Sequence, residues 1–192
     1  MTLKQTPSQT VGPYFAYGLT PEQYGYDYRS LFGPVLAGPD ARGEHIRVTG
    51  RVFDGDGVPV NDAMIEILQP DAEGRFVAST SEARASDFRG FGRCGTGTHA
   101  SLHFWFDTVK PGAAAPGEAP HIDVIVTMRG MLSHAFTRVY FEDEAAANAH
   151  DPILSCVPPE RRSTLVARCP AAGRYEFDLV LQGPHETVFF DV

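Results

Sequence analysis

The chain has 192 residues, a formal net charge of −8 and 43% hydrophobic residues. This length fits one domain, and the apolar content is ordinary for a globular protein, which excludes disordered and collagen-like chains. The acidic balance gives no basic face for nucleic acid, and the longest apolar runs are too short to span a bilayer as a helix.

The first residues and the cysteines bear on the compartment. Residues 1–5 are not followed by a secretory apolar segment. Cys94, Cys156 and Cys169 are odd in number and follow no metal or redox spacing. We therefore expect a reduced, cytoplasmic protein.

Residues 1–44 are rich in Pro, Gly and Tyr and lack helical or strand periodicity. Residues 10–15 and 24–28 concentrate aromatic side chains, which need a surface to pack on. We predict an extended, ordered arm that either covers its own domain or contacts a second subunit and an active site.

From residue 45 to 192 the pattern is that of short strands separated by turns. Ile46, Val48 and Val52 alternate along a first strand, which ends at the Asp-Gly turn 54–57. Further strands are predicted at 63–68, 75–77, 101–106, 121–128, 134–141, 174–181 and 187–190. Short helices are predicted at 143–148, with Asp143 as cap, and at 158–165. Such spacing is typical of an all-β, antiparallel β-sandwich.

The predicted strand 121–128 begins with a histidine and an aspartate two residues apart. Residues i and i+2 of a strand share a face, so His121 and Asp123 point outward together, opposite a core-facing row. That row is Ile122, Val124, Val126 and Met128. One imidazole and one carboxylate are two possible ligands of a divalent metal. The candidates for a third ligand, none of them marked by spacing, are His99, His103 and His134.

Seven segments in collinear order carry a family resemblance: residues 6–14, 50–55, 71–76, 108–112, 119–122, 138–141 and 186–191. They include Thr-Val-Gly-Pro-Tyr at 10–14 and Ala-Pro-His-Ile at 119–122. Together they resemble the intradiol ring-cleavage dioxygenases over nearly the whole chain. The resemblance implies a β-sandwich of mixed topology.

In that family a ferric ion is held by two tyrosines and two histidines. At the matching positions this chain has Phe76 and Ala114 in place of the tyrosines and Asp123 in place of the second histidine. Only His121 matches, and Glu118 stands where the relatives have an arginine. The resemblance therefore implies that this chain binds no iron.

Heteromeric members of the family pair a degenerate alpha chain with an iron-bearing beta chain, and the catalytic cleft lies between them. The resemblance places Arg129 at that cleft, together with arm residues Thr10, Gly12, Pro13 and Tyr14. An arginine fork matches a substrate carboxylate in geometry and charge. The resemblance thus implies O2-dependent ring cleavage in which this chain binds substrate and the partner's Fe(III) carries the chemistry. Taken alone, Arg129 is a surface charge ending a strand.

Two other classes stay open. One is a homomeric enzyme that uses another metal through His121 and Asp123, which predicts stoichiometric metal in the isolated chain. The other is a sandwich binding module of transthyretin-like type, in which the resemblance reflects fold ancestry alone.

Overall fold

The computed structural model describes residues 12–97 and 99–191. The strands in these residues are β1 (His45–Phe53), β2 (Met64–Leu68), β3 (Phe91–Gly95), β4 (His103–Val109), β5 (His121–Thr127), β6 (Ala135–Phe141), β7 (Val166–Ala171), β8 (Arg174–Glu176) and β9 (Leu179–Val180). The helical segments are α1 (Pro13–Leu19), η1 (Pro21–Tyr24), α2 (Thr80–Ser86), η2 (Glu142–Glu144), α3 (Ala145–Asn148), α4 (Pro152–Cys156) and η3 (Pro159–Leu165). The expected all-β fold with short helices is confirmed.

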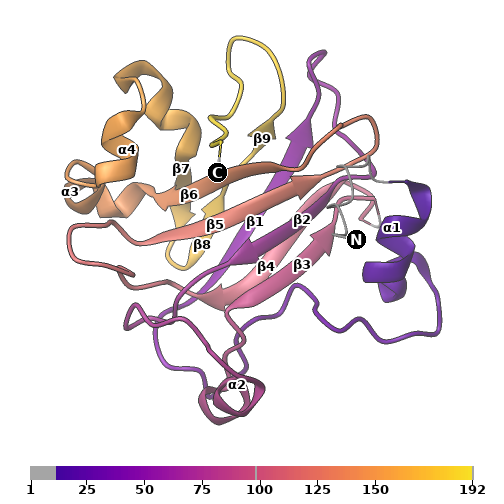
Figure 1. The fold of residues 1–192 in the computed structure, drawn as a ribbon, viewed down its shortest axis with the longest axis horizontal. Helices are drawn as coiled ribbons and strands as arrows, with labels where there is room; N and C mark the ends of the chain where they lie inside the picture. The colour runs from indigo at the N-terminus through magenta and orange to yellow at the C-terminus, as the bar shows by residue number, and fades with distance from the viewer. Residues whose placement is uncertain (1–11, 98, 192) are drawn as a thin grey trace, which may run out of the picture.

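The strands follow the order β3-β2-β5-β6-β7-β8-β1-β4, and β9 pairs with β1. The sheet folds over, so that β5 and β2 lie in front of β1 and β4 (Figure 1). Between the two layers, Ile122 and Val124 of β5 share one buried core with Val48 of β1 and Phe106 of β4. This two-layer arrangement confirms the sandwich.

The expectation of a purely antiparallel sandwich is wrong, because β1 runs parallel to β8 and β9, and β6 runs parallel to β7. The helical excursion over residues 142–165 returns the chain beside β6 in the same direction, and the chain then continues to the edge of β1. Alternation of apolar residues is the same in parallel and antiparallel strands of this kind, so it does not report direction. The mixed topology implied by the family resemblance is the one observed.

Several element predictions need correction. Residues 75–77 are extended but form no strand, and residues 187–190 contribute a single bridge, between Phe136 and Phe190. Strand β3 was not expected, because two of its five residues are glycines that interrupt the apolar alternation. Helices α1, α2 and α4 were also not expected; each is at most seven residues long, too short for a clear 3.6-residue period.

The two predicted helices are present, as η2 with α3 and as the 3-10 segment η3. Asp143, however, does not cap the alanine run. Its carboxylate accepts a hydrogen bond from Lys110 Nζ at 2.6 Å and one from the Tyr175 hydroxyl at 3.0 Å. Asp143 therefore joins the helical excursion to the strands instead of starting a helix.

Residues 12–44 run along the sandwich before β1. Leu36 and Ala41 are buried in the main core, and the Leu36 N–H donates to the Asp107 carbonyl at 2.8 Å. By contrast, Tyr14, Tyr28 and Leu31 are exposed. The boundary between arm and body at residue 44 stays a prediction. No helix in the part of the chain described here is long and apolar enough to cross a membrane.

Candidate functional site

The start of β5 holds the one histidine that matches the family's ligands. His121 Nε2 lies 3.8 Å from Asp123 Oδ1, so the predicted convergence of the two side chains is confirmed. The predicted outward exposure of His121 is wrong, since only 3% of it is accessible. The helical excursion packs over this end of β5 and β6 (Figure 1). This packing forms a second buried cluster, separate from the main core. Its residues are Ala119, Tyr140, Leu154, Val157 and Leu165.

Arg138 occupies the space beside this pair. The register of β5 and β6 places Asp123 opposite Arg138, whose Nε donates to Asp123 Oδ1 at 2.9 Å. Within the described residues, Arg138 Nη1 is buried without a hydrogen-bond partner. A fixed positive charge therefore sits where a bound cation would approach Asp123.

Behind Arg138, Tyr140 and Asp151 complete a buried network. The Tyr140 hydroxyl donates to Asp151 Oδ1 at 3.0 Å, and the N–H groups of Leu154 and Ala119 donate to the same carboxylate. Burial opposes ionisation of Asp151, but the hydrogen bonds from Leu154, Ala119 and Tyr140 outweigh it and hold its pKa below the ordinary value. Burial raises the pKa of Tyr140, so this phenol stays neutral.

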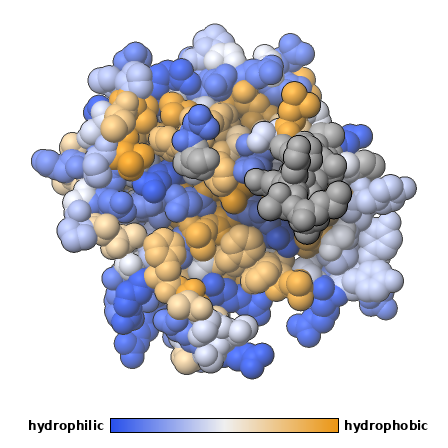
Figure 2. All heavy atoms as spheres, viewed as in Figure 1, coloured by the Kyte–Doolittle hydropathy of each residue, from blue (hydrophilic) through white to orange (hydrophobic). Residues whose placement is uncertain are grey.

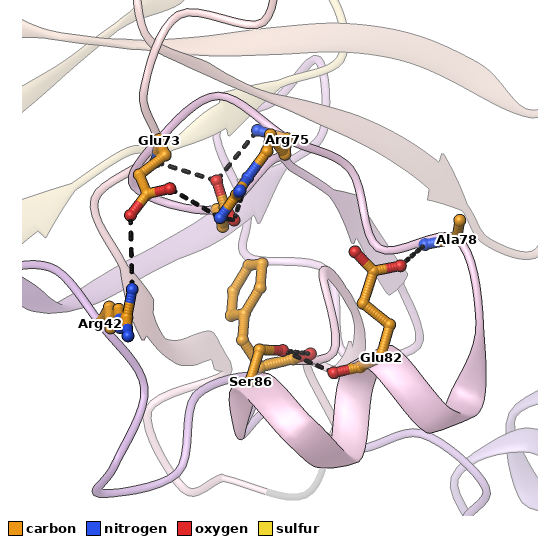
Figure 3. A network of polar contacts seen from close by, with 8 residues as sticks. Arg42, Glu73, Arg75, Ala78, Glu82 and Ser86 are labelled. Carbon is orange, nitrogen blue, oxygen red and sulfur yellow. Dashed lines mark hydrogen bonds and ion pairs between the residues drawn. The ribbon is translucent and has the colours of Figure 1, made fainter.

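The loops that carry Phe76 and Ala114 are neighbours. The Gly112 N–H donates to the Asp71 carbonyl at 2.9 Å, and a Cβ on Gly74 would meet the Ala113 carbonyl oxygen at 2.0 Å. The first loop is held by ion pairs from Glu73 to Arg75 and to Arg42, which Figure 3 shows. These contacts bring the loops together, but the two side chains offer nothing to a metal.

The donor set does not fit a ferric ion. Phe76 and Ala114 have no ligand atom, and Asp123 is bonded to the guanidinium of Arg138. Across residues 12–97 and 99–191, no three His, Cys, Asp or Glu side chains come together as a possible metal site. The histidines considered as third ligands lie elsewhere: His99 stacks on His103 at 3.7 Å between ring centroids, and His134 packs on Phe136.

Arg129 lies past the other end of β5. Its side chain is 61% exposed, and its Nε donates to the Asp62 carboxylate. This carboxylate raises the pKa of Arg129 and keeps it charged. The interpretation of Arg129 as a surface charge is therefore incomplete, because Arg129 is hydrogen-bonded to Asp62.

The tyrosines in and after α1 lie at the same end of the sandwich as Arg129. Tyr14 is 82% exposed and packs edge-to-face on Tyr17, with 6.2 Å between ring centroids. Tyr17 packs in turn on Tyr24, whose pKa is raised by burial and by the charges around it, Asp62 among them. Gly12 precedes α1 with open space around its Cα, Pro13 begins the helix, and Thr10 lies outside the described residues.

His121 with Asp123, and Arg129 with the tyrosines near α1, thus lie at opposite ends of β5. The six steps of β5 from His121 to Thr127 span roughly 20 Å at about 3.3 Å per residue, and Arg129 lies two residues beyond. Three residues at these ends were not anticipated: Asp62, Arg138 and Asp151. Arg138 lies in a segment that carries the family resemblance. The contacts of all three residues, however, can be identified only once the strands are paired.

Comparisons with known proteins agree with this fold. A protein-family model described as dioxygenase matches residues 12–183. The protocatechuate 3,4-dioxygenase alpha chain of Burkholderia cepacia is 64% identical over 195 residues, covering 100% of this chain and 99% of the relative. The beta chain of the same enzyme and organism is 35% identical over 161 residues, covering 76% of this chain and 67% of the relative.

Among solved structures, an intradiol ring-cleavage dioxygenase from Tetranychus urticae superposes with a TM-score of 0.61. It is 17% identical, and the match covers 96% of this chain and 98% of that one. At this identity the likeness bears on the fold alone, and it matches the mixed sandwich described above.

Proposed function

Because this chain belongs to the intradiol dioxygenase family, we propose that it is the alpha chain of a heteromeric protocatechuate 3,4-dioxygenase. In this proposal a beta chain of the same fold holds Fe(III), and this chain holds none. The reaction opens the ring of protocatechuate between the two hydroxyl-bearing carbons. Both atoms of O2 enter the product, 3-carboxy-cis,cis-muconate. The identity of 64% over the full length to an alpha chain supports this assignment.

The separation of Arg129 from His121 is the observation that carries the proposal. The whole of β5, roughly 20 Å from His121 to Thr127, lies between them, which is far longer than one aromatic ring. Arg129 is therefore too far away to orient a substrate bound at the degenerate pocket of its own chain. We propose that it orients a substrate carboxylate in the cleft of the beta chain.

The arm would complete that cleft. Tyr14 and Gly12 are exposed beside the Arg129 end, and Pro13 starts a helix that presents them. We propose that these residues, with Thr10, enclose the substrate, which can raise the rate by orientation and by excluding water without any catalytic side chain. This chain supplies binding residues and no catalytic ones.

A surface for the partner is available on the front layer. Figure 2 shows apolar side chains gathered in the middle of this face, between hydrophilic ones. Exposed apolar residues include Leu68 at the end of β2, Phe76 in the following loop, and Phe32 packed on Phe91 of β3. We propose that the beta chain covers apolar surface of this kind in a larger alpha–beta assembly.

The three cysteines are all free, which fits a reducing compartment, and we propose a cytoplasmic location.

The first experiment is purification of this chain alone and together with its beta chain, followed by assays of iron per protomer and of protocatechuate-dependent O2 uptake. Iron and O2 uptake are expected in the co-complex and not in the lone chain. Stoichiometric metal with turnover in the lone chain would instead favour the homomeric enzyme that uses His121 and Asp123. A co-complex without turnover would favour the binding module.

A further inference from the structure

We infer that Asp62 is a positioning residue for Arg129 and orients its guanidinium for a substrate carboxylate. The inference rests on the proposed function, because it assigns a task to Arg129 at the partner's cleft. It adds a residue that the sequence did not single out and that touches no substrate itself.

Strand pairing places Asp62 opposite Arg129. In the antiparallel ladder of β2 and β5, Met64 pairs with Thr127. Asp62 is two residues before Met64, and Arg129 is two residues after Thr127. The two residues therefore continue the same register beyond the last hydrogen-bonded pair. Directly opposed side chains in such a ladder are within contact distance. The Arg129 Nε donates to Asp62 Oδ2.

The backbone around Asp62 is held rigidly by the buried Thr96. Its hydroxyl donates to the Val60 carbonyl at 2.7 Å and accepts from the Ala63 N–H at 3.2 Å. The Thr96 N–H donates to the Ala63 carbonyl at 2.9 Å. Asp62 is thus a fixed anchor, with its side chain 25% exposed, whereas Arg129 is 61% exposed in the turn that precedes Gly130.

Because the hydrogen bond to Asp62 uses Nε, it leaves the two Nη nitrogens of the Arg129 guanidinium for a ligand. Guanidinium has five N–H groups, and a carboxylate can bind in bidentate fashion to the edge formed by the two Nη nitrogens. Within the described part of the chain these nitrogens have no hydrogen-bond partner, so that edge is available. Fixing the stem in advance lowers the conformational entropy that is lost when substrate binds.

Among the described residues, Asp62 is the one carboxylate that forms an ion pair with Arg129. The neutral hydroxyl of Tyr17 is the other group that bears on the pKa of Arg129. The phenol of Tyr17 packs among Tyr14, Tyr24 and Tyr26. The Asp62 carboxylate therefore orients Arg129, and the rings of these tyrosines lie beside it.

The test is the steady-state kinetics of the alpha–beta complex carrying Asp62→Asn. We expect the KM for protocatechuate to rise about 5-fold, because the variant loses roughly one exposed charged hydrogen bond. The kcat should change less than about twofold. Catechol, which lacks the carboxylate, should show an unchanged KM or inhibition constant. Asp62→Glu keeps the charge and should stay within about twofold of the parent protein.

Three comparisons make the result decisive. Asp107→Asn is the matched control, since Asp107 pairs with Arg47 on the surface far from this turn, and its KM should not change. Arg129→Gln should raise the KM for protocatechuate about 10- to 100-fold, and adding Asp62→Asn to it should have no further effect. Thermal unfolding of each complex shows whether the variants fold equally well.

The inference fails if Asp62→Asn leaves the KM unchanged, impairs catechol as strongly as protocatechuate, or prevents assembly while Asp107→Asn does not. If Arg129→Gln raises the KM and Asp62→Asn does not, only the role of Asp62 is lost. If Arg129→Gln also leaves the KM unchanged, the proposed role of Arg129 at the cleft is itself wrong.

Discussion

At the scale of single residues, the degenerate pocket is stabilised by its own hydrogen bonds. Arg138 donates to Asp123, and Tyr140 donates to Asp151. A buried carboxylate is stable only when its oxygens are satisfied, and Asp151 accepts three such bonds. These hydrogen bonds join β5, β6 and α4 to one another.

We predict that Asp151→Asn lowers the free energy of unfolding at pH 7 by about 1–3 kcal/mol. The folded pKa of Asp151 is lowered, so its contribution is present above the unfolded pKa near 4 and is lost as pH falls through the folded value. The difference between variant and parent should therefore shrink below about pH 4. Urea unfolding at pH 7 and pH 3.5 measures it.

Glu160→Gln is the control for this prediction, because Glu160 is exposed on η3. Its stability should match that of the parent protein at both pH values. A constant penalty for Asp151→Asn at both pH values would show that shape, and not charge, is what the site requires.

At the scale of elements, the layers depend on close approaches that only glycine allows. Gly50 lies in the middle of β1, where a Cβ would come within 1.7 Å of the Phe177 carbonyl oxygen and 2.7 Å of the Phe104 ring. The Phe177 N–H donates to the Thr49 carbonyl at 2.8 Å. The parallel neighbours of β1 therefore pack against its backbone at this point.

We predict that Gly50→Ala destabilises the fold by at least about 2 kcal/mol, because a backbone carbonyl, unlike a side-chain tip, has no free rotation by which to make room. Gly33→Ala, where a Cβ would meet nothing within 4 Å, should change stability by less than about 0.5 kcal/mol. Thermal unfolding of the two variants compares them. Equal stability would mean that β1 and residues 176–178 separate easily.

At the scale of the whole molecule, β5 separates two regions of different use. The helical excursion covers its start (Figure 1), and past its end Arg129 is 61% exposed near the tyrosines of the arm. In the proposed function the two ends have different tasks: the Arg129 end faces the partner, and the His121 end stabilises the fold.

We predict that, in the alpha–beta complex, Asp123→Asn leaves kcat and the KM for protocatechuate within about twofold of the parent, whereas Arg129→Gln raises the KM about 10- to 100-fold. The reason is the separation of these positions, which are six residues apart, or roughly 20 Å at about 3.3 Å per residue of extended chain. Steady-state O2 uptake measures both variants. Loss of metal and turnover on Asp123→Asn would contradict the two-region view and make the His121 pocket the active site.

The sequence by itself determined the sandwich and the replacement of three of the four residues that hold iron in the family, with His121 retained. Alternation at Ile122, Val124 and Val126 is local, and the missing donors at Phe76 and Ala114 follow from residue identity. Both can be identified in the sequence without knowing which residues lie across the sheet. Arg129 and Tyr14 became candidates only through the family resemblance, which is also carried by the sequence.

Only the tertiary structure decided the direction of β7, β8 and β9, the burial of His121, and the partners of the two arginines. Each depends on segments far apart in the chain: residues 142–165 fold back over His121, β6 brings Arg138 to Asp123, and the register of β2 and β5 brings Asp62 to Arg129. A strand's local pattern specifies which face is apolar, but pairing and register arise from long-range packing, and those contacts decide which polar residues meet.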